Sequence, residues 1–378
     1  MAPKPNHLTI DAASQNGEAS QLTLVPRSTK PEDGEEITSQ HKRKLSEARD
    51  SDDEIEVVKD ESEGEEGPAK KARPSYTRHE RFWLLDGNVV LQIGQTRFRL
   101  HRSRLASQSP WFEALFEKHA GREPNADHGG QDLDKVTVEE DEGVGVFHLG
   151  EDNVLVSLSD FVELLKAMDE AIAFRYSSPG FLVHAAIYRA ADDLIFPAYR
   201  EYAQRFMEEE FSDALDTVTA EIKPHAAEAV QLADNWYLPR LFKRAFYELA
   251  RNPNAYNAGL VNDDGDNVLE GGLMLRLLSV QKNLAKAWTQ LVLSDDNAFQ
   301  CKTPKCHSDR PENYWAALEN DGFLGKHALD PIYGLQVLAT LDWSKHNHCT
   351  HCKRARRSAF ARKRLQLWKD MDGWMPTQ

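Results

Sequence analysis

The chain has 378 residues, of which 40% are hydrophobic and 28% charged, and its formal net charge is −15. This length allows about two domains with a full apolar core, and the lack of a long apolar run argues against a membrane span. The first residues lack the apolar stretch of a signal peptide, so we expect an intracellular, reducing location in which disulfides are unusual.

Residues 1–74 contain no aromatic side chain and are dominated by Pro, Ser, Glu and Lys. This composition predicts a disordered, charged tail. Within it, Asp50–Glu66 is strongly acidic and is bracketed by two basic clusters, His41–Lys44 and Lys70–Arg73. The clusters are either a nuclear import signal or ordinary solvated charge. The first alternative predicts a nuclear or nucleocytoplasmic protein.

A strand-to-helix transition follows the tail. Asn88–Ile93 and Arg97–Leu100 read as two strands of a hairpin joined by the turn residues Gly94-Gln95-Thr96. Ser109 is a good helix N-cap, and Pro110 fits the first helical position. The apolar face of the predicted helix is formed by Trp111, Phe112, Leu115 and Phe116.

This stretch resembles the BTB/POZ domain, and its opening residues, Arg78–Trp83, resemble the fungal BTB-only proteins. The positions that match the family pattern are Asp86, Gly87, His101, Leu105, Ser109, Pro110, Phe112, Leu115 and Phe116. The resemblance implies an α+β fold for residues 75–252, with a small β-sheet flanked by a helical cluster. It also implies a homodimer, with the apolar stretch Phe82–Leu85 near the dimer surface.

The rest of the BTB-like region is assigned by pattern. We expect a polar loop over Gly121–Glu142, a third strand at Val144–Leu149, and a third helix capped by Ser159 whose buried face includes Ile172. The stretch between the third and fourth family helices is unusually long, and part of it predicts an added helix. The added helix and the closing helix pair are predicted at Pro197–Phe211, Ala226–Trp236 and Leu238–Leu249.

Residues 253–378 are predicted to be a separate, mostly helical region. Asn252–Gly272 reads as a linker, and Leu273–Leu293 reads as a helix with Met274, Leu277, Leu278, Ala285 and Trp288 facing inward. Lys302–His348 gives few strong strand or helix signals. A basic helix is then predicted at about Lys353–Met371.

The four cysteines form two closely spaced pairs within this region. Four residues lie between Cys301 and Cys306, and two residues lie between Cys349 and Cys352. Such pairs suit a tetrahedral Zn²⁺ held by four thiolates, which would be structural because a catalytic zinc needs an open position. The alternative is four idle thiols. Nearby histidines that could replace one sulfur are His307, His346, His348 and His351.

The predicted basic helix carries Lys353, Arg354, Arg356, Arg357, Arg362, Lys363 and Arg364. It predicts either a phosphate-contacting helix or a solvated face, and we favour the solvated face because Asn and Gln, which read base edges, are scarce. Ala361, Leu365 and Trp368 are spaced to dock the helix.

Phosphate-loop, dinucleotide-binding, zinc-protease and nucleophile-elbow motifs are missing, so we expect no enzyme. His101 is read as a structural residue of the turn into the first helix. The leading hypothesis is a protein-interaction protein that dimerises through the BTB region and recruits partners. Some relatives bridge substrates to a cullin-type ubiquitin ligase, and others regulate transcription. The alternative is a nuclear nucleic-acid-binding regulator that uses the basic helix.

Overall fold

The computed structural model divides the chain into two units, Met1–Lys71 and Ala72–Gln378. It describes residues 76–123, 133–141, 143–149, 156–177, 179–255, 269, 271–294, 301, 303–306 and 311–375. The predicted disordered tail, its acidic run and both basic clusters lie outside these residues, as does most of the predicted linker. No helix within the described ranges has the length and apolar character needed to cross a bilayer.

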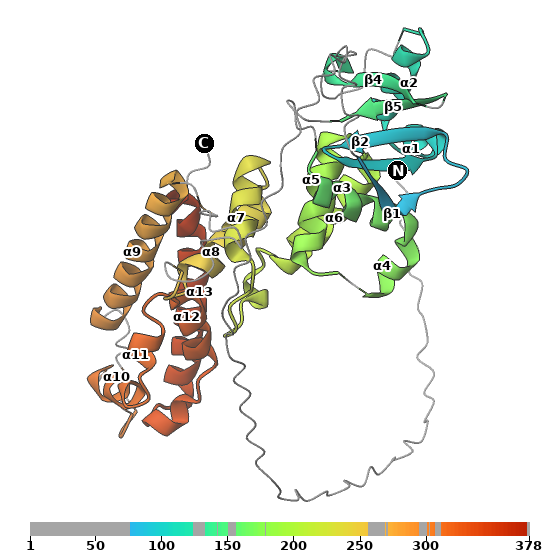
Figure 1. The fold of residues 1–378 in the computed structure, drawn as a ribbon. Helices are drawn as coiled ribbons and strands as arrows, with labels where there is room; N and C mark the ends of the chain where they lie inside the picture. Colours follow the sequence, from blue (N-terminus) through green and yellow to red (C-terminus); the bar gives the residue numbers. More distant parts are fainter. Residues whose placement is uncertain are drawn as a thin grey trace, which may run out of the picture. The chain divides into compact units, whose positions relative to one another are not determined.

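A five-stranded sheet lies at the start of the described chain (Figure 1). Its strands are β1 (Thr77–Trp83), β2 (Val89–Ile93), β3 (Thr96–Leu100), β4 (Thr137–Asp141) and β5 (Val144–His148), in the order β1-β3-β2-β5-β4. The antiparallel pairing of β2 with β3 confirms the predicted hairpin, and β5 confirms the predicted third strand. The sequence reading missed β1 and β4. The prediction of a loop through Glu142 was therefore wrong over Thr137–Asp141.

Six helices belong with the sheet: α1 (Arg102–Gln108), α2 (Pro110–His119), α3 (Leu158–Asp169), α4 (Ala171–Ser177), α5 (Phe181–Asp193) and α6 (Pro197–Glu210). The Ser109 hydroxyl accepts from the Phe112 N–H, which confirms the predicted cap. The cap of α3 is Ser157 and not Ser159, and Ile172 lies in α4, 78% exposed. Helix α6 confirms the predicted added helix.

Two further helices, α7 (Ala226–Asn235) and α8 (Pro239–Ala250), form the predicted closing pair. Pro239 occupies the first turn of α8, where its missing N–H leaves no helical bond unmade. The apolar side chains of α8 are buried, among them Leu241, Phe242, Ala245, Phe246 and Leu249. Between α6 and α7 the chain has little regular structure, apart from the short 3₁₀ helix η2 (Leu215–Thr217).

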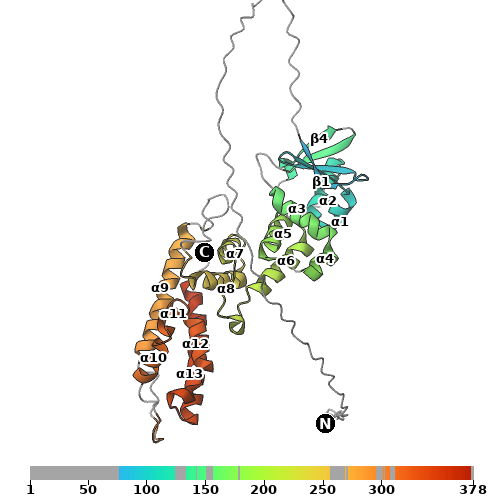
Figure 2. The ribbon, with the colours of Figure 1, turned by 60° about the horizontal axis from the view of Figure 1, so that its bottom comes forward.

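The remaining elements are helical: α9 (Gly271–Leu293), α10 (Pro311–Glu319), α11 (Phe323–Lys326), α12 (Pro331–Thr340), η4 (Trp343–His346) and α13 (Thr350–Trp374). Helices α9, α12 and α13 run beside one another (Figure 2). The sequence gives few strong helix signals over Lys302–His348, yet its described residues form α10, α11, α12 and η4. Asp330 caps α12 by accepting from the Tyr333 N–H, and Pro331 follows it.

Two details of the helical packing differ from the prediction. Leu278 is 49% exposed, whereas Leu277 and Trp288 are buried as expected. On α13 Trp368 is buried as predicted, but Ala361 and Leu365 are exposed, so the docking face was predicted only in part. Its buried side chains are Cys352, Arg356, Phe360, Leu367, Trp368 and Met371.

Candidate metal centre and interaction surfaces

The structure brings all four cysteines together. Their Sγ atoms all lie within 4.8 Å of one another, and those of Cys301 and Cys349 are 3.5 Å apart. All four are free thiols. Around one zinc with bonds of about 2.3 Å, tetrahedral sulfurs would be about 3.8 Å apart, so the observed cluster matches the size of such a site.

Local backbone geometry favours thiolates in this cluster. The Cys349 N–H donates to Cys306 Sγ at 3.4 Å, and the Thr303 N–H donates to Cys301 Sγ at 3.4 Å. The backbone N–H of Cys352, in the first turn of α13, lowers the pKa of Cys349 to about 6. Hydrogen bonds from Thr303 also lower the pKa of Cys301. Thiolates are the form that binds metal, so the donor set fits Zn²⁺.

The histidines predicted as substitute ligands take no part in the metal-sized group formed by the described residues. His348 is buried, and its Nε2 accepts from Arg356 Nε at 2.8 Å. Its Nδ1 lies 2.8 Å from the carbonyl oxygen of His346. Both ring nitrogens are therefore used in holding the start of α13. His307 lies outside the described residues.

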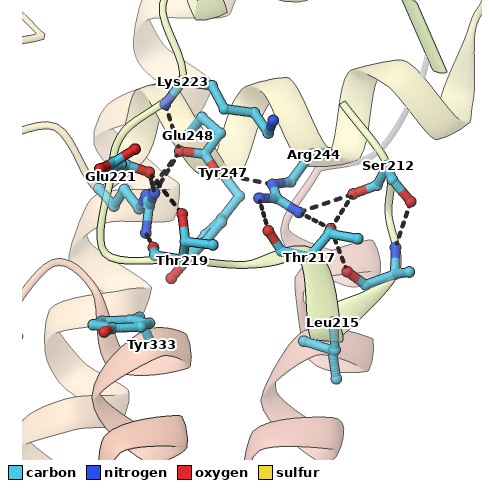
Figure 3. A network of polar contacts seen from close by, with 12 residues as sticks. Ser212, Leu215, Thr217, Thr219, Glu221, Lys223, Arg244, Tyr247, Glu248 and Tyr333 are labelled. Carbon is cyan, nitrogen blue, oxygen red and sulfur yellow. Dashed lines mark hydrogen bonds and ion pairs between the residues drawn. The ribbon is translucent and has the colours of Figure 1, made fainter. Parts of the chain in front are cut away.

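A buried ionic network on α8 was missed by the sequence reading (Figure 3). Arg244 and Glu248 form an ion pair of 2.8 Å in which both side chains are 0% exposed. Arg244 also donates to the Ser212 and Thr217 carbonyl oxygens and to Thr217 Oγ1. The guanidinium thus replaces the missing secondary-structure bonds of the segment between α6 and α7.

Arg251 extends this network into the C-terminal helices. It pairs with Glu248 at 2.8 Å and with Asp330 at 3.1 Å, and it donates to the Thr219 carbonyl oxygen. The Tyr247 hydroxyl donates to Asp330, the residue that caps α12. A single spacing signal, Arg-x-x-x-Glu-x-x-Arg on a helix, was visible in the sequence, but the partners in other segments were not.

The apolar stretch Phe82–Leu85 divides between core and surface. Phe82 is 2% exposed, and the centroid of its ring lies 5.1 Å from that of the His79 ring. Its side chain therefore belongs to the core under the sheet. Leu85 is 90% exposed in the turn between β1 and β2. Among the described strands, β1 lies at the edge of the sheet and pairs only with β3. The surface in this area is therefore formed by β1 and Leu85.

An open apolar groove of about 490 Å³ lies between α3, α4 and α6. Its lining includes Ala167, Ala171, Phe174, Pro197 and Tyr199. Two large apolar side chains of α4, Ile172 and Tyr176, are 78% and 84% exposed. Because α6 is the added helix, part of this groove comes from sequence beyond the stretch that resembles the BTB pattern.

Comparison with known proteins bears on the sheet region. Residues 84–140 match the family model described as the BTB/POZ domain. No curated protein matches the chain. The matched residues include β2, β3, α1, α2 and most of β4, and the four cysteines lie outside them. On the match and on the observed α+β sheet with its helical cluster, the chain contains a BTB/POZ domain.

Proposed function

We propose that the protein is a non-enzymatic interaction protein that forms a homodimer through its BTB/POZ domain and recruits other proteins. BTB/POZ domains are interaction modules, which supports the general class. The exposure of Leu85 beside the edge strand β1 carries the proposal of self-association. A large apolar side chain held almost entirely in water gains free energy when a second surface covers it.

The self-association proposal is tested by light scattering of the purified full chain at micromolar concentration. The wild type is expected to have the mass of a dimer. Leu85→Glu would place a charge in the interface and should give a monomer. Leu293→Glu is the matched control, because Leu293 is also an exposed leucine, 78% accessible, on α9. A monomeric wild type, or equal dissociation by both variants, would contradict the proposal.

We propose that the groove between α3, α4 and α6 is the recruitment surface, and that it takes a peptide segment with apolar anchors. Ala171→Glu would place a carboxylate in the groove at an exposed position of α4 and should leave the fold intact. Parallel affinity purifications from wild type and variant, with mass-spectrometric identification, should show partners that the variant alone loses. Recovery of a cullin among those partners would support a ubiquitin-ligase adaptor. Identical partner sets would exclude the groove.

We propose further that Cys301, Cys306, Cys349 and Cys352 hold one structural Zn²⁺. The convergence of four sulfurs from two distant segments supports this proposal. With four thiolates the coordination sphere is closed, so the ion would stabilise the fold and not act on a substrate. Part of the binding free energy would then contribute to folding of the segment between the two pairs.

Metal analysis of the purified protein should find one zinc per chain. Cys349→Ser with Cys352→Ser should abolish it and make residues 295–378 sensitive to protease. The sheet region contains no cysteine and should stay resistant, which provides an internal control. A zinc-free wild type whose four thiols all react freely under native conditions would contradict the proposal.

We propose a nuclear location, supported by the basic clusters His41–Lys44 and Lys70–Arg73. A fluorescent fusion of the wild type should accumulate in nuclei, because short basic clusters are recognised by import receptors. Replacement of the lysines and arginines of both clusters with alanine should leave the fusion in the cytoplasm. An unchanged distribution would exclude the clusters as an import signal.

A further inference from the structure

Most of helix α13 is strongly basic, whereas the chain as a whole is acidic. Between Thr350 and Lys369 the sequence has eight lysines or arginines and no aspartate or glutamate. The whole chain, by contrast, carries a net charge of −15. Cations interspersed with acids form a solvated surface, whereas an uninterrupted run of one sign creates a local field that can attract a polyanion.

Two of the eight cations, Arg356 and Arg364, are withdrawn from the solvent by burial. Arg356 is fully buried and donates to His348. Arg364 is half-buried and donates to the Ile332 carbonyl oxygen at 3.1 Å and to Gln336 Oε1. Burial lowers the pKa of Arg364. Arg356 thus holds α13 to His348, which follows η4, and Arg364 holds it to α12, so we leave both out of the external surface.

Four other cations share one exposed face. We call Arg354, Arg357, Arg362 and Lys369 the basic stripe. At 100° per residue they fall within a sector about 140° wide, and all four are exposed. Arg357 donates one bond to the Leu341 carbonyl oxygen at 3.1 Å. The other three make no ion pair or hydrogen bond with any residue in the described part of the chain.

The length of the stripe bears on the nature of its partner. From Arg354 to Lys369 the helix rises about 22 Å. This length matches about six successive phosphates along one strand of a DNA duplex. A single phosphorylated side chain would occupy only one end of such a surface. Arginine, which supplies three of the four cations, presents a planar fork of donors that matches phosphate oxygens.

We propose that the basic stripe of α13 binds the phosphate backbone of a nucleic acid. The exposed face holds Gln366 but few other groups that can read base edges, so recognition is independent of sequence. The four-cysteine cluster adjoins the first turn of α13, close to where the stripe begins. This activity is additional to protein recruitment by the BTB/POZ domain.

The test is fluorescence anisotropy of the full chain with labelled 20-base-pair DNA of two unrelated sequences and with a single-stranded RNA of the same length. Measurements at 50 mM salt and above should give equal affinities for the two duplexes. Four phosphate contacts predict a slope of log K against log salt of about −3.6 for duplex DNA. Comparison of the DNA and RNA arms identifies the preferred nucleic acid.

A matched pair of variants tests the residues. Arg354→Gln with Arg362→Gln should weaken duplex binding on the order of tenfold and reduce the slope by about 1.8. Lys282→Gln with Lys286→Gln removes the same charge from exposed positions of α9 and should change neither. Absence of binding, equal losses in both variants, or equal competition by polyglutamate and DNA would each overturn the proposal.

Discussion

The sheet region, residues 76–210, and the helical region, residues 211–375, share one apolar core but differ in the charged side chains that they bury. In the sheet region Phe98, Trp111 and Phe161 are 0% exposed, and every ion pair in its described residues has at least one partner that reaches the surface. In the helical region Arg244, Glu248 and Arg251 are ion-paired with no exposure at all. Apolar burial tolerates changes of neighbour, whereas a buried charge depends on particular partners.

In the helical region, buried charged side chains connect segments that are distant in sequence. Its buried arginines bind the backbone between α6 and α7, and Arg251 also reaches the cap of α12. The four cysteines bring residues near position 301 close to the start of α13, where the proposed zinc would link them. The helical region therefore adds a few specific links between segments distant in sequence to the apolar core that it shares with the sheet region.

The largest effect is expected from Glu248→Ala. The change would leave two buried guanidinium groups without their shared carboxylate, which typically costs about 3–5 kcal/mol. Urea denaturation followed by circular dichroism should show this loss of unfolding free energy. Glu170→Ala, which breaks the exposed pair with Arg81, should cost less than about 1 kcal/mol. Equal losses would remove the distinction between the regions. If Glu248→Ala does not fold, Glu248→Gln supplies the comparison.

A pH effect should come next in size and should arise from the helical region. His327 is 5% exposed among the rings of Trp288, Phe323 and Tyr333, and burial lowers its pKa to about 4. As pH falls from about 6.5 to 4, the unfolded chain binds a proton that the folded chain does not, so stability falls by as much as about 3 kcal/mol.

His327→Gln removes the titrating group and should flatten this dependence. Urea denaturation at several pH values between 4 and 7 gives the comparison with the wild type. The variant loses ring contacts and should be less stable at pH 7, so the slope and not the absolute stability is the measured quantity. An unchanged slope would show that His327 is not responsible.

The third prediction concerns packing within the helical region. A Cβ on Gly334 in α12 would lie 2.8 Å from the ring of Trp288 and 2.9 Å from Cβ of His327. Gly334→Ala should therefore cost about 1–3 kcal/mol, because the rigid indole cannot move away without disturbing the core. A Cβ on Gly325 in α11 would meet nothing within 4 Å, so Gly325→Ala is the matched control. Thermal unfolding should separate the two variants, and equal melting temperatures would contradict the expected clash.

Elements that are set by local sequence patterns could be predicted, and elements that depend on distant partners could not. The hairpin, the Ser109 cap and the α7–α8 pair follow from local periodicity and capping residues, and all were confirmed. Strand β4 was missed because Thr137–Asp141 lies at the sheet edge with three exposed side chains and shows no apolar alternation. In the C-terminal region, α10 to α12 are short helices that depend on distant partners.

The candidate site was predictable only in part. The two cysteine pairs were identified from their spacing, and the structure brings all four sulfurs together. The partners of the buried arginines were not predictable, because backbone carbonyls such as those of Ser212 and Thr219 have no sequence signature. The prediction of the buried face of α13 was also wrong in part. Arg356 is buried and donates a hydrogen bond to His348, whereas Leu365 is exposed. The predicted domain boundary after residue 252 and the zinc itself stay predictions.

Hydrogen exchange before and after chelation tests most directly whether specific links order the helical region. Deuterium uptake of the full chain would be measured by mass spectrometry with and without a zinc chelator. Removal of the metal should accelerate exchange at residues 303–306 and in the first turns of α13, while β2, β3 and α3 keep their protection. Unchanged uptake around the cysteines, or an equal increase in the sheet region, would contradict this account.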